Sequence, residues 1–217
     1  MAHRSASHVV VFAASAAILA GCNHELPPAT TLAASLQGPG NGDSSVVFVR
    51  PVSPCDTSGY SIVVDERGHF VGNVSPGMQV SVAVSPGPHV FYSWSSLDLR
   101  IESQPSFNTV AAARVEAAPG QTEYLALIVN RPTYNCLDWA IVDLRVIGQS
   151  DGYWNELQEV LHATQPVNAD TTAGQAILDG KPALLKLYLE LGHRKMQQLD
   201  ETRIRDAERR AVRAETR

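Results

Sequence analysis

Between residues 45 and 147 turn-forming residues divide the chain into short apolar stretches, and this spacing constrains the fold more than any other feature. Val80, Val82 and Val84 alternate with small or polar residues, as expected for a β-strand with one buried face. Pro-Gly pairs at residues 76–77, 86–87 and 119–120 mark turns. Short strands with frequent turns are typical of an antiparallel sandwich. We therefore predict a mainly β fold, an antiparallel immunoglobulin-like β-sandwich of about eight strands over residues 45–148.

Two strand assignments in this region carry further detail. Residues 61–64 and 69–71 flank the sequence Asp-Glu-Arg-Gly at 65–68, which is a hairpin signature with Gly68 placed to take a positive φ. Residues 125–129 and 139–142 are apolar on both faces, so we expect them to be central strands that another element covers on the outside.

After residue 148 the pattern becomes helical, which predicts an extension over residues 149–217. Trp154, Leu157 and Leu161 form one stripe. Asp170 or Thr171 is placed to cap a short helix that ends near Gly180. Pro182 then opens a long helix whose apolar side contains Leu184, Leu185, Tyr188, Leu191, Met196 and Leu199. Beyond Asp200 this helix is polar all round, and both a solvated helix and a partner-binding helix fit that pattern.

The N-terminus has the composition of an export signal. Residues 9–20 are uninterruptedly small or apolar and end in Leu-Ala-Gly-Cys at 19–22. About 12 residues are too few for a transmembrane helix. The motif resembles the lipobox of bacterial lipoproteins, which implies that residues 1–21 are a signal peptide and that Cys22 becomes the acylated first residue. An ordinary cleaved signal and a buried first helix are the alternatives. Asn23, rather than Asp, favours the outer membrane over the inner one.

Residues 22–44 are expected to be a lipidated N-terminus followed by a flexible tether. The segment contains Pro27-Pro28 and a glycine-rich run at residues 38–42, and it has few apolar residues. No strand precedes that glycine-rich run, so it does not predict a phosphate-binding loop.

Composition and charge restrict the function classes. The chain of 217 residues is 44% hydrophobic and carries a formal charge of −5, which becomes −6 once Arg4 is removed with the signal. Because affinity for nucleic acid comes largely from Lys and Arg on phosphates, we expect no nucleic-acid partner.

With Cys22 acylated, Cys55 and Cys136 remain as a pair that an oxidising compartment would join in a disulfide. Two buried free thiols and a reactive thiol are the alternatives.

The strand region also resembles PEGA-like domains and related small lipoprotein domains of unknown function from Gram-negative bacteria. The similarity covers roughly residues 45–130 and lies in four strings of residues: 47–51, 62–72, 82–89 and 118–124. These residues make turns and strands, so the resemblance implies an envelope or surface role and transfers no catalytic residue.

The search for chemistry gives one catalytic-looking motif. Residues 148–152 read GQSDG and match the G-x-S-x-G pattern around a nucleophilic Ser150, with Asp170 or Asp179 and then His193 in the required chain order. The antiparallel hairpins upstream are not the alternating βα units that build a hydrolase sheet. We therefore expect a serine hydrolase only as a minor alternative, and no catalytic residue.

Histidines and tryptophans are the remaining candidates for ligand sites. His69, His89, His162 and His193 lack metal-ligand spacing, so we predict neither a metal site nor a cofactor. Trp94, Trp139 and Trp154 are either core residues or the lining of a ligand groove, and the core is the commoner role.

The sequence as a whole predicts a non-enzymatic lipoprotein that is anchored to the membrane through Cys22. Its sandwich would contact an envelope protein, with the C-terminal helix as the docking element. A small-ligand or glycan-binding module with exposed Tyr or Trp is the second hypothesis, and a contiguous aromatic surface groove would favour it.

Overall fold

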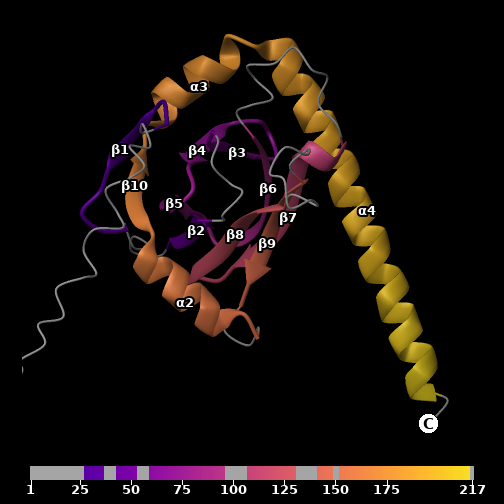
Figure 1. Cartoon of the computed structure of the whole chain (residues 1–217). Helices are drawn as coiled ribbons and strands as arrows, with labels where there is room; N and C mark the ends of the chain where they lie inside the picture. The colour runs from indigo at the N-terminus through magenta and orange to yellow at the C-terminus, as the bar shows by residue number, and fades with distance from the viewer. Residues whose placement is uncertain are drawn as a thin grey trace, which may run out of the picture.

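The computed structural model describes residues 27–36, 43–52, 59–95, 107–130, 141–148 and 152–215, with the backbone alone for residues 129–130, 141–143 and 211–215. Two β-sheets face each other and three helices lie outside them (Figure 1). The predicted sites at Cys22, Cys55, Cys136, Trp139 and Ser150 lie outside the described residues. No helix in the described ranges is both long and apolar enough to span a bilayer.

The first sheet has six strands in the order β1-β10-β5-β2-β8-β9. Its members are β1 (Thr30–Leu32), β2 (Ser44–Arg50), β5 (Met78–Val84), β8 (Thr122–Asn130), β9 (Ile141–Ile147) and β10 (Gln165–Ala169). The β2–β8 and β10–β5 pairs are parallel, and the other three are antiparallel. The sheet is therefore mixed, which departs from the predicted all-antiparallel arrangement.

The second sheet has four antiparallel strands in the order β4-β3-β6-β7. Its members are β3 (Ser61–Asp65), β4 (Phe70–Val74), β6 (Gly87–Ser95) and β7 (Val110–Ala117), with a short 3-10 turn, η1 (Phe107–Thr109), before β7. The predicted hairpin is confirmed: β3 pairs with β4, and Gly68 in the turn has φ +85. A Cβ at Gly68 would also lie 2.9 Å from Leu189 Cδ1 of α4, so a side chain there would force Leu189 to shift.

A hydrophobic core fills the space between the sheets. Phe48 of β2 and Phe91 of β6 meet edge to face across it, with ring centroids 5.0 Å apart. Around them the side chains that alternate on the inner faces are buried, including Val63, Val80 and Leu125. These are the positions that the alternation in the sequence predicts. A mainly β structure with two facing sheets and a long C-terminal helix is thus confirmed.

Helices cover the outer face of each sheet. Helix α2 (Trp154–Ala163) lies on the first sheet, where Leu157 is buried against Val49, Ala126 and Ile147. Helices α3 (Thr171–Asp179) and α4 (Pro182–Glu215) cover the second sheet. The predicted helix signals hold: Asp170 caps α3 by accepting from Ala173 N (2.9 Å), and α4 begins at Pro182.

The contact of α4 with the second sheet is aromatic at its centre. Tyr188 stacks on the fully buried Trp94 at 4.6 Å, with ring planes within 5° of parallel. Farther along, Asp200 accepts two hydrogen bonds of 3.1 Å from the guanidinium of Arg114 on β7. Leu199, which the pattern placed on the buried side, is 36% exposed. The apolar seam therefore ends before residue 199, and beyond it α4 extends past the sheets (Figure 1).

Three expectations about the sheets are corrected. Among the described residues, β2–β9 make eight strands between Ser44 and Ile147, and two further strands lie outside that region: β1 in the segment expected to be a tether and β10 in the segment expected to be helical. Strand β10 was not predicted because it contains Pro166, and proline argues against an interior strand. In the structure the carbonyl oxygen of Pro166 still accepts a hydrogen bond from Ala33 N (3.1 Å), just after β1. Strand β9, expected to be central, is the edge of its sheet. The face of β9 that points toward the other sheet is apolar, and Leu144 on that face is buried in the core between the sheets.

The buried Tyr92 of β6 predicts an alkaline sensitivity. Burial, and to a lesser degree Glu66, raise the pKa of Tyr92 to about 12, against a smaller lowering by Arg114. The unfolded chain loses this proton near pH 10, so the free energy of unfolding should fall between pH 10 and 12, by roughly 3 kcal/mol in total from this group. Urea unfolding of Tyr92→Phe over pH 9–12 should give a shallower decline than the parent protein. Parallel curves would contradict the assignment.

Candidate functional site

A groove of about 690 Å³ lies where β8 begins, β9 ends and α2 begins. Strands β8 and β9 are paired so that Tyr124 lies opposite Ile147, and α2 then crosses the same outer face. The residues that line the groove come from all three elements and from the segments next to them: Gln121, Thr122, Glu123, Tyr124, Ile147, Gly148, Trp154 and Gln158.

One wall of the groove is aromatic. Tyr124 and Trp154 meet edge to face, with centroids 5.6 Å apart and planes at 75°. Both rings pack in part against the apolar cluster under α2, and both side chains are only half-buried. The rings are therefore fixed from behind by packing, while the rest of their surface lines the groove.

The remaining lining is polar and nearly uncharged. Gln121 and Gln158 supply amide groups, and the Thr122 hydroxyl is 2.7 Å from that of Ser45. Glu123 is the one charged residue among the eight that line the groove. An amide and carboxylate set of this kind provides several donors and acceptors without a cation to attract an anionic ligand.

A cation–π contact braces the start of α2 beside the groove. The guanidinium carbon of Arg145 lies 3.9 Å from the centroid of the Tyr153 ring. Arg145 and Ile147 are two positions apart on β9 and so share the outer face. Since Tyr153 directly precedes Trp154, this contact helps to hold Trp154 in place.

The two described tryptophans take one each of the two roles that the sequence left open, and Trp139 lies outside the described residues. Trp94 is a core residue, fully buried and stacked on Tyr188. Trp154 lines the groove. Tyr124, Gln121 and Gln158 were missed, because only the parallel insertion of β8 beside β2 and the crossing of α2 bring them together. An aromatic residue on the outer face of a strand was the one available signal.

The residues proposed as partners of Ser150 have other roles. Asp170 caps α3, and Asp179 accepts a hydrogen bond from Gln175 Nε2 (2.9 Å). His193 packs edge-on against Tyr92, with centroids 5.4 Å apart. Asp179 and His193 do line one shallow depression along α4. Ser150 itself lies outside the described residues, so the hydrolase hypothesis stays a prediction.

Two histidines that are distant in sequence share a hollow. His69 and His89 both line a depression of about 410 Å³ between the β3–β4 turn and β5. His69 Nδ1 donates to Asp65 Oδ2 (2.9 Å), and His89 Nε2 donates to Ser85 O (2.7 Å). Within the described part of the chain, no group of three or more His, Cys, Asp or Glu is placed to hold a metal ion.

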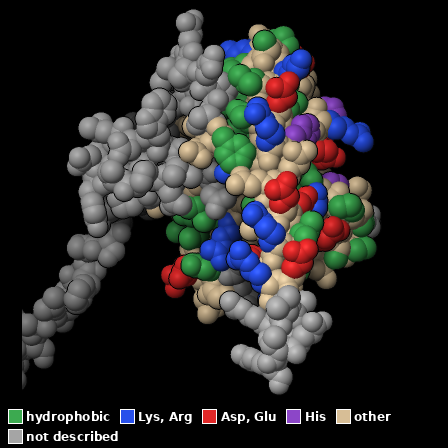
Figure 2. Space-filling view, turned by 90° about the vertical axis from the view of Figure 1, so that its right-hand side faces the viewer, with side chains coloured by type: hydrophobic (Ala, Val, Ile, Leu, Met, Phe, Trp, Pro, Cys, Tyr) green, Lys and Arg blue, Asp and Glu red, His purple; other side chains and the backbone are tan. Residues whose placement is uncertain are grey.

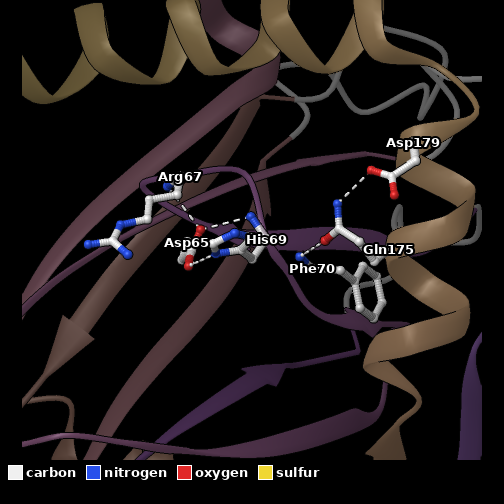
Figure 3. A network of polar contacts seen from close by, with 6 residues as sticks. All are labelled: Asp65, Arg67, His69, Phe70, Gln175 and Asp179. Carbon is white, nitrogen blue, oxygen red and sulfur yellow. Dashed lines mark hydrogen bonds and ion pairs between the residues drawn. The ribbon is translucent and has the colours of Figure 1, made fainter.

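Asp65 is the centre of a polar network that shapes the β3–β4 turn (Figure 3). Its Oδ1 accepts from the backbone N–H groups of Arg67 (2.9 Å) and His69 (2.8 Å). Next to the turn, Phe70 N donates to Gln175 Oε1 of α3 (2.8 Å). The bonds to Asp65 stabilise the turn, and the bond from Phe70 N to Gln175 connects the hairpin to α3.

The face that carries α4 shows acidic and basic side chains interspersed along its length (Figure 2). Residues 201–210 of α4 are all exposed. A mixture of this kind provides no single-sign surface in the described residues on that face.

Comparison with protein-family models and with curated proteins finds no match to this chain. The resemblance to PEGA-like domains and the lipobox therefore stay predictions from the sequence.

Proposed function

We propose that this chain is a non-enzymatic envelope lipoprotein whose folded domain binds a neutral saccharide in the groove between β8, β9 and α2. The observation that carries the proposal is the fixed, half-exposed pair Tyr124 and Trp154 beside a lining of amide, hydroxyl and carboxylate groups. Two adjoining aromatic rings in a groove support a ligand-binding module over a purely structural domain.

The chemistry of a sugar ring fits this lining. One face of a pyranose presents C–H groups, which pack on an aromatic ring, while its hydroxyls need paired donors and acceptors. Gln121 and Gln158 supply amide donors and acceptors beside the aromatic wall. None of the eight lining residues is a Lys, Arg or His, so the lining offers no countercharge to an anionic sugar, and a neutral ligand fits it best.

Several parts of the proposal rest on the sequence. They are the acyl anchor on Cys22, an outer-membrane location, a disulfide between Cys55 and Cys136, and the immunoglobulin-like, PEGA-like type of sandwich. The mixed first sheet limits that last assignment, since an immunoglobulin-like sandwich is antiparallel.

A second candidate function is protein docking through the distal half of α4, which one observation favours. Residues 201–210 are exposed on every side, and this part of the helix extends beyond the sheets (Figure 1). Ile204 is 59% exposed there. In-cell crosslinking from position 204 should recover one reproducible envelope protein if this candidate is right, and only unspecific products if it is wrong.

Removing the indole should abolish most of the saccharide binding. For Trp154→Ala we expect at least a tenfold weaker affinity, because truncating a central aromatic anchor costs about 2 kcal/mol or more and about 1.4 kcal/mol is tenfold. Isothermal titration of the folded domain with chitotriose and cellotriose measures this, and Trp154→Phe should retain part of the affinity.

The control for this prediction is Ile204→Ala, which removes an exposed apolar side chain far along α4, away from the groove. Its affinity should equal that of the parent domain. Failure of the parent domain to bind any neutral oligosaccharide, or equal binding by parent and Trp154→Ala, would overturn the proposed ligand class.

A further inference from the structure

The segment just after the proposed anchor is part of the folded domain. Pro27 is buried, and β1 pairs with β10 over three residues in antiparallel register, from Thr30 with Ala169 to Leu32 with Val167. Strand β10 in turn pairs with β5 in the middle of the sheet. Residues 30–32 are thus joined to the core through continuous backbone pairing.

Side-chain and backbone bonds fasten the turn before β1 from two other elements. Asn73 of β4 donates from Nδ2 to Pro28 O (2.7 Å), and Asp170 N at the start of α3 donates to Ala29 O (2.8 Å). Ala29 has φ +56, a left-handed conformation that costs an alanine about 1–2 kcal/mol. Such a conformation persists where surrounding contacts hold it, and here both neighbouring carbonyls are bonded.

This attachment shortens the reach between membrane and domain. Only residues 23–26 separate Cys22 from Pro27, so five Cα–Cα steps span at most about 17 Å. Had all of residues 22–44 been free, the same bound would be about 75 Å.

We infer that the anchored domain is held against the bilayer surface by a clamp of residues 27–32 on β4, β10 and α3, and does not stand away on a long tether. This inference rests on the acyl anchor of the proposed function. It also restricts the class of saccharide that the groove can reach. The saccharide must lie close to the bilayer, as the headgroup of a glycolipid does, because its distance from the membrane cannot exceed the length of residues 23–26 plus the diameter of the domain.

Two insertions distinguish a clamp from a free tether. A fluorescent amino acid replaces Ile177, an exposed residue of α3, and the acylated full chain is placed in phosphatidylethanolamine–phosphatidylglycerol vesicles that carry an acceptor on a lipid headgroup. A 20-residue Gly-Ser insertion goes either between Glu25 and Leu26 or after Gly40. The first should lower energy transfer at least about twofold, because it adds about 25 Å of root-mean-square reach. The second should leave the transfer unchanged, since it follows the clamp.

Equal losses from both insertions would overturn the clamp and restore the free tether. No loss from either would overturn the inference too, because the domain would then be held at the bilayer by something other than the leader. The anchor itself is tested separately: the Cys22→Ser chain should not bind vesicles, and a parent chain that carries no acyl group by mass spectrometry refutes the anchor. Saccharide binding by the groove, measured without vesicles, is independent of both results.

Discussion

Replacing Arg50 with methionine is expected to lower the free energy of unfolding by about 3 kcal/mol or more. Arg50 ends β2 in the first sheet, and its side chain is 1% exposed. Its Nη1 donates to Val74 O and to Ser61 Oγ, both at 3.2 Å, and more weakly to Gly59 O (3.4 Å). The guanidinium therefore joins β2 to the ends of β3 and β4 in the other sheet.

The physical reason for this large effect is the set of groups left behind. Methionine retains much of the volume but leaves buried oxygen atoms without a donor, at about 1–3 kcal/mol for each. Chemical denaturation measures the change. Arg67→Met, in the exposed β3–β4 turn, is the matched control and should change stability by less than about 0.5 kcal/mol. Equal stabilities for Arg50→Met and the parent protein would show that the guanidinium does not hold the sheets together.

Gly174→Ala should destabilise the domain, although alanine usually stabilises a helix. Gly174 lies in the middle of α3, and a Cβ there would overlap the ring of Phe70 on β4. Alanine gains about 1 kcal/mol of helix propensity over glycine. Overpacking a filled site costs about 1–3 kcal/mol, so we expect a net loss, together with loosening of α3 from the second sheet. Thermal unfolding and hydrogen exchange of the α3 amides measure the two effects.

Two comparisons separate the steric cause from a general effect of the substitution. Gly180→Ala, at the end of the same helix with φ −67, has room for a Cβ and should be near neutral. In a Phe70→Leu background the cost of Gly174→Ala should shrink, because the two sites are in contact and their effects do not add. An undiminished cost in that background would contradict the packing explanation.

Local patterns in the sequence predicted the elements whose signals are themselves local. The hairpin around Gly68, the Asp170 cap and the start of α4 at Pro182 depend on residues that are neighbours in the chain. For the same reason the alternating valines of β5 identified the buried face correctly.

What the sequence did not predict depends on pairing between distant segments. Strand β1 has three residues, one of them 53% exposed, and forms because β10 offers it an edge. The parallel pairing of β8 with β2 also joins distant segments, and no local sequence signal predicts it. The groove follows from it, because Tyr124 and Trp154 are thirty positions apart and meet only through that topology.

Binding of a neutral saccharide in the Tyr124–Trp154 groove can be followed at the indole N–H resonances. In a ¹⁵N-labelled domain the Trp154 indole signal, assigned through Trp154→Phe, should shift progressively as chitotriose or cellotriose is added. The signal of Trp94, buried against Tyr188 on the other sheet, should stay in place. An unmoved Trp154 signal at high saccharide concentration, or equal shifts of Trp94 and Trp154, would show that the saccharide does not bind in this groove.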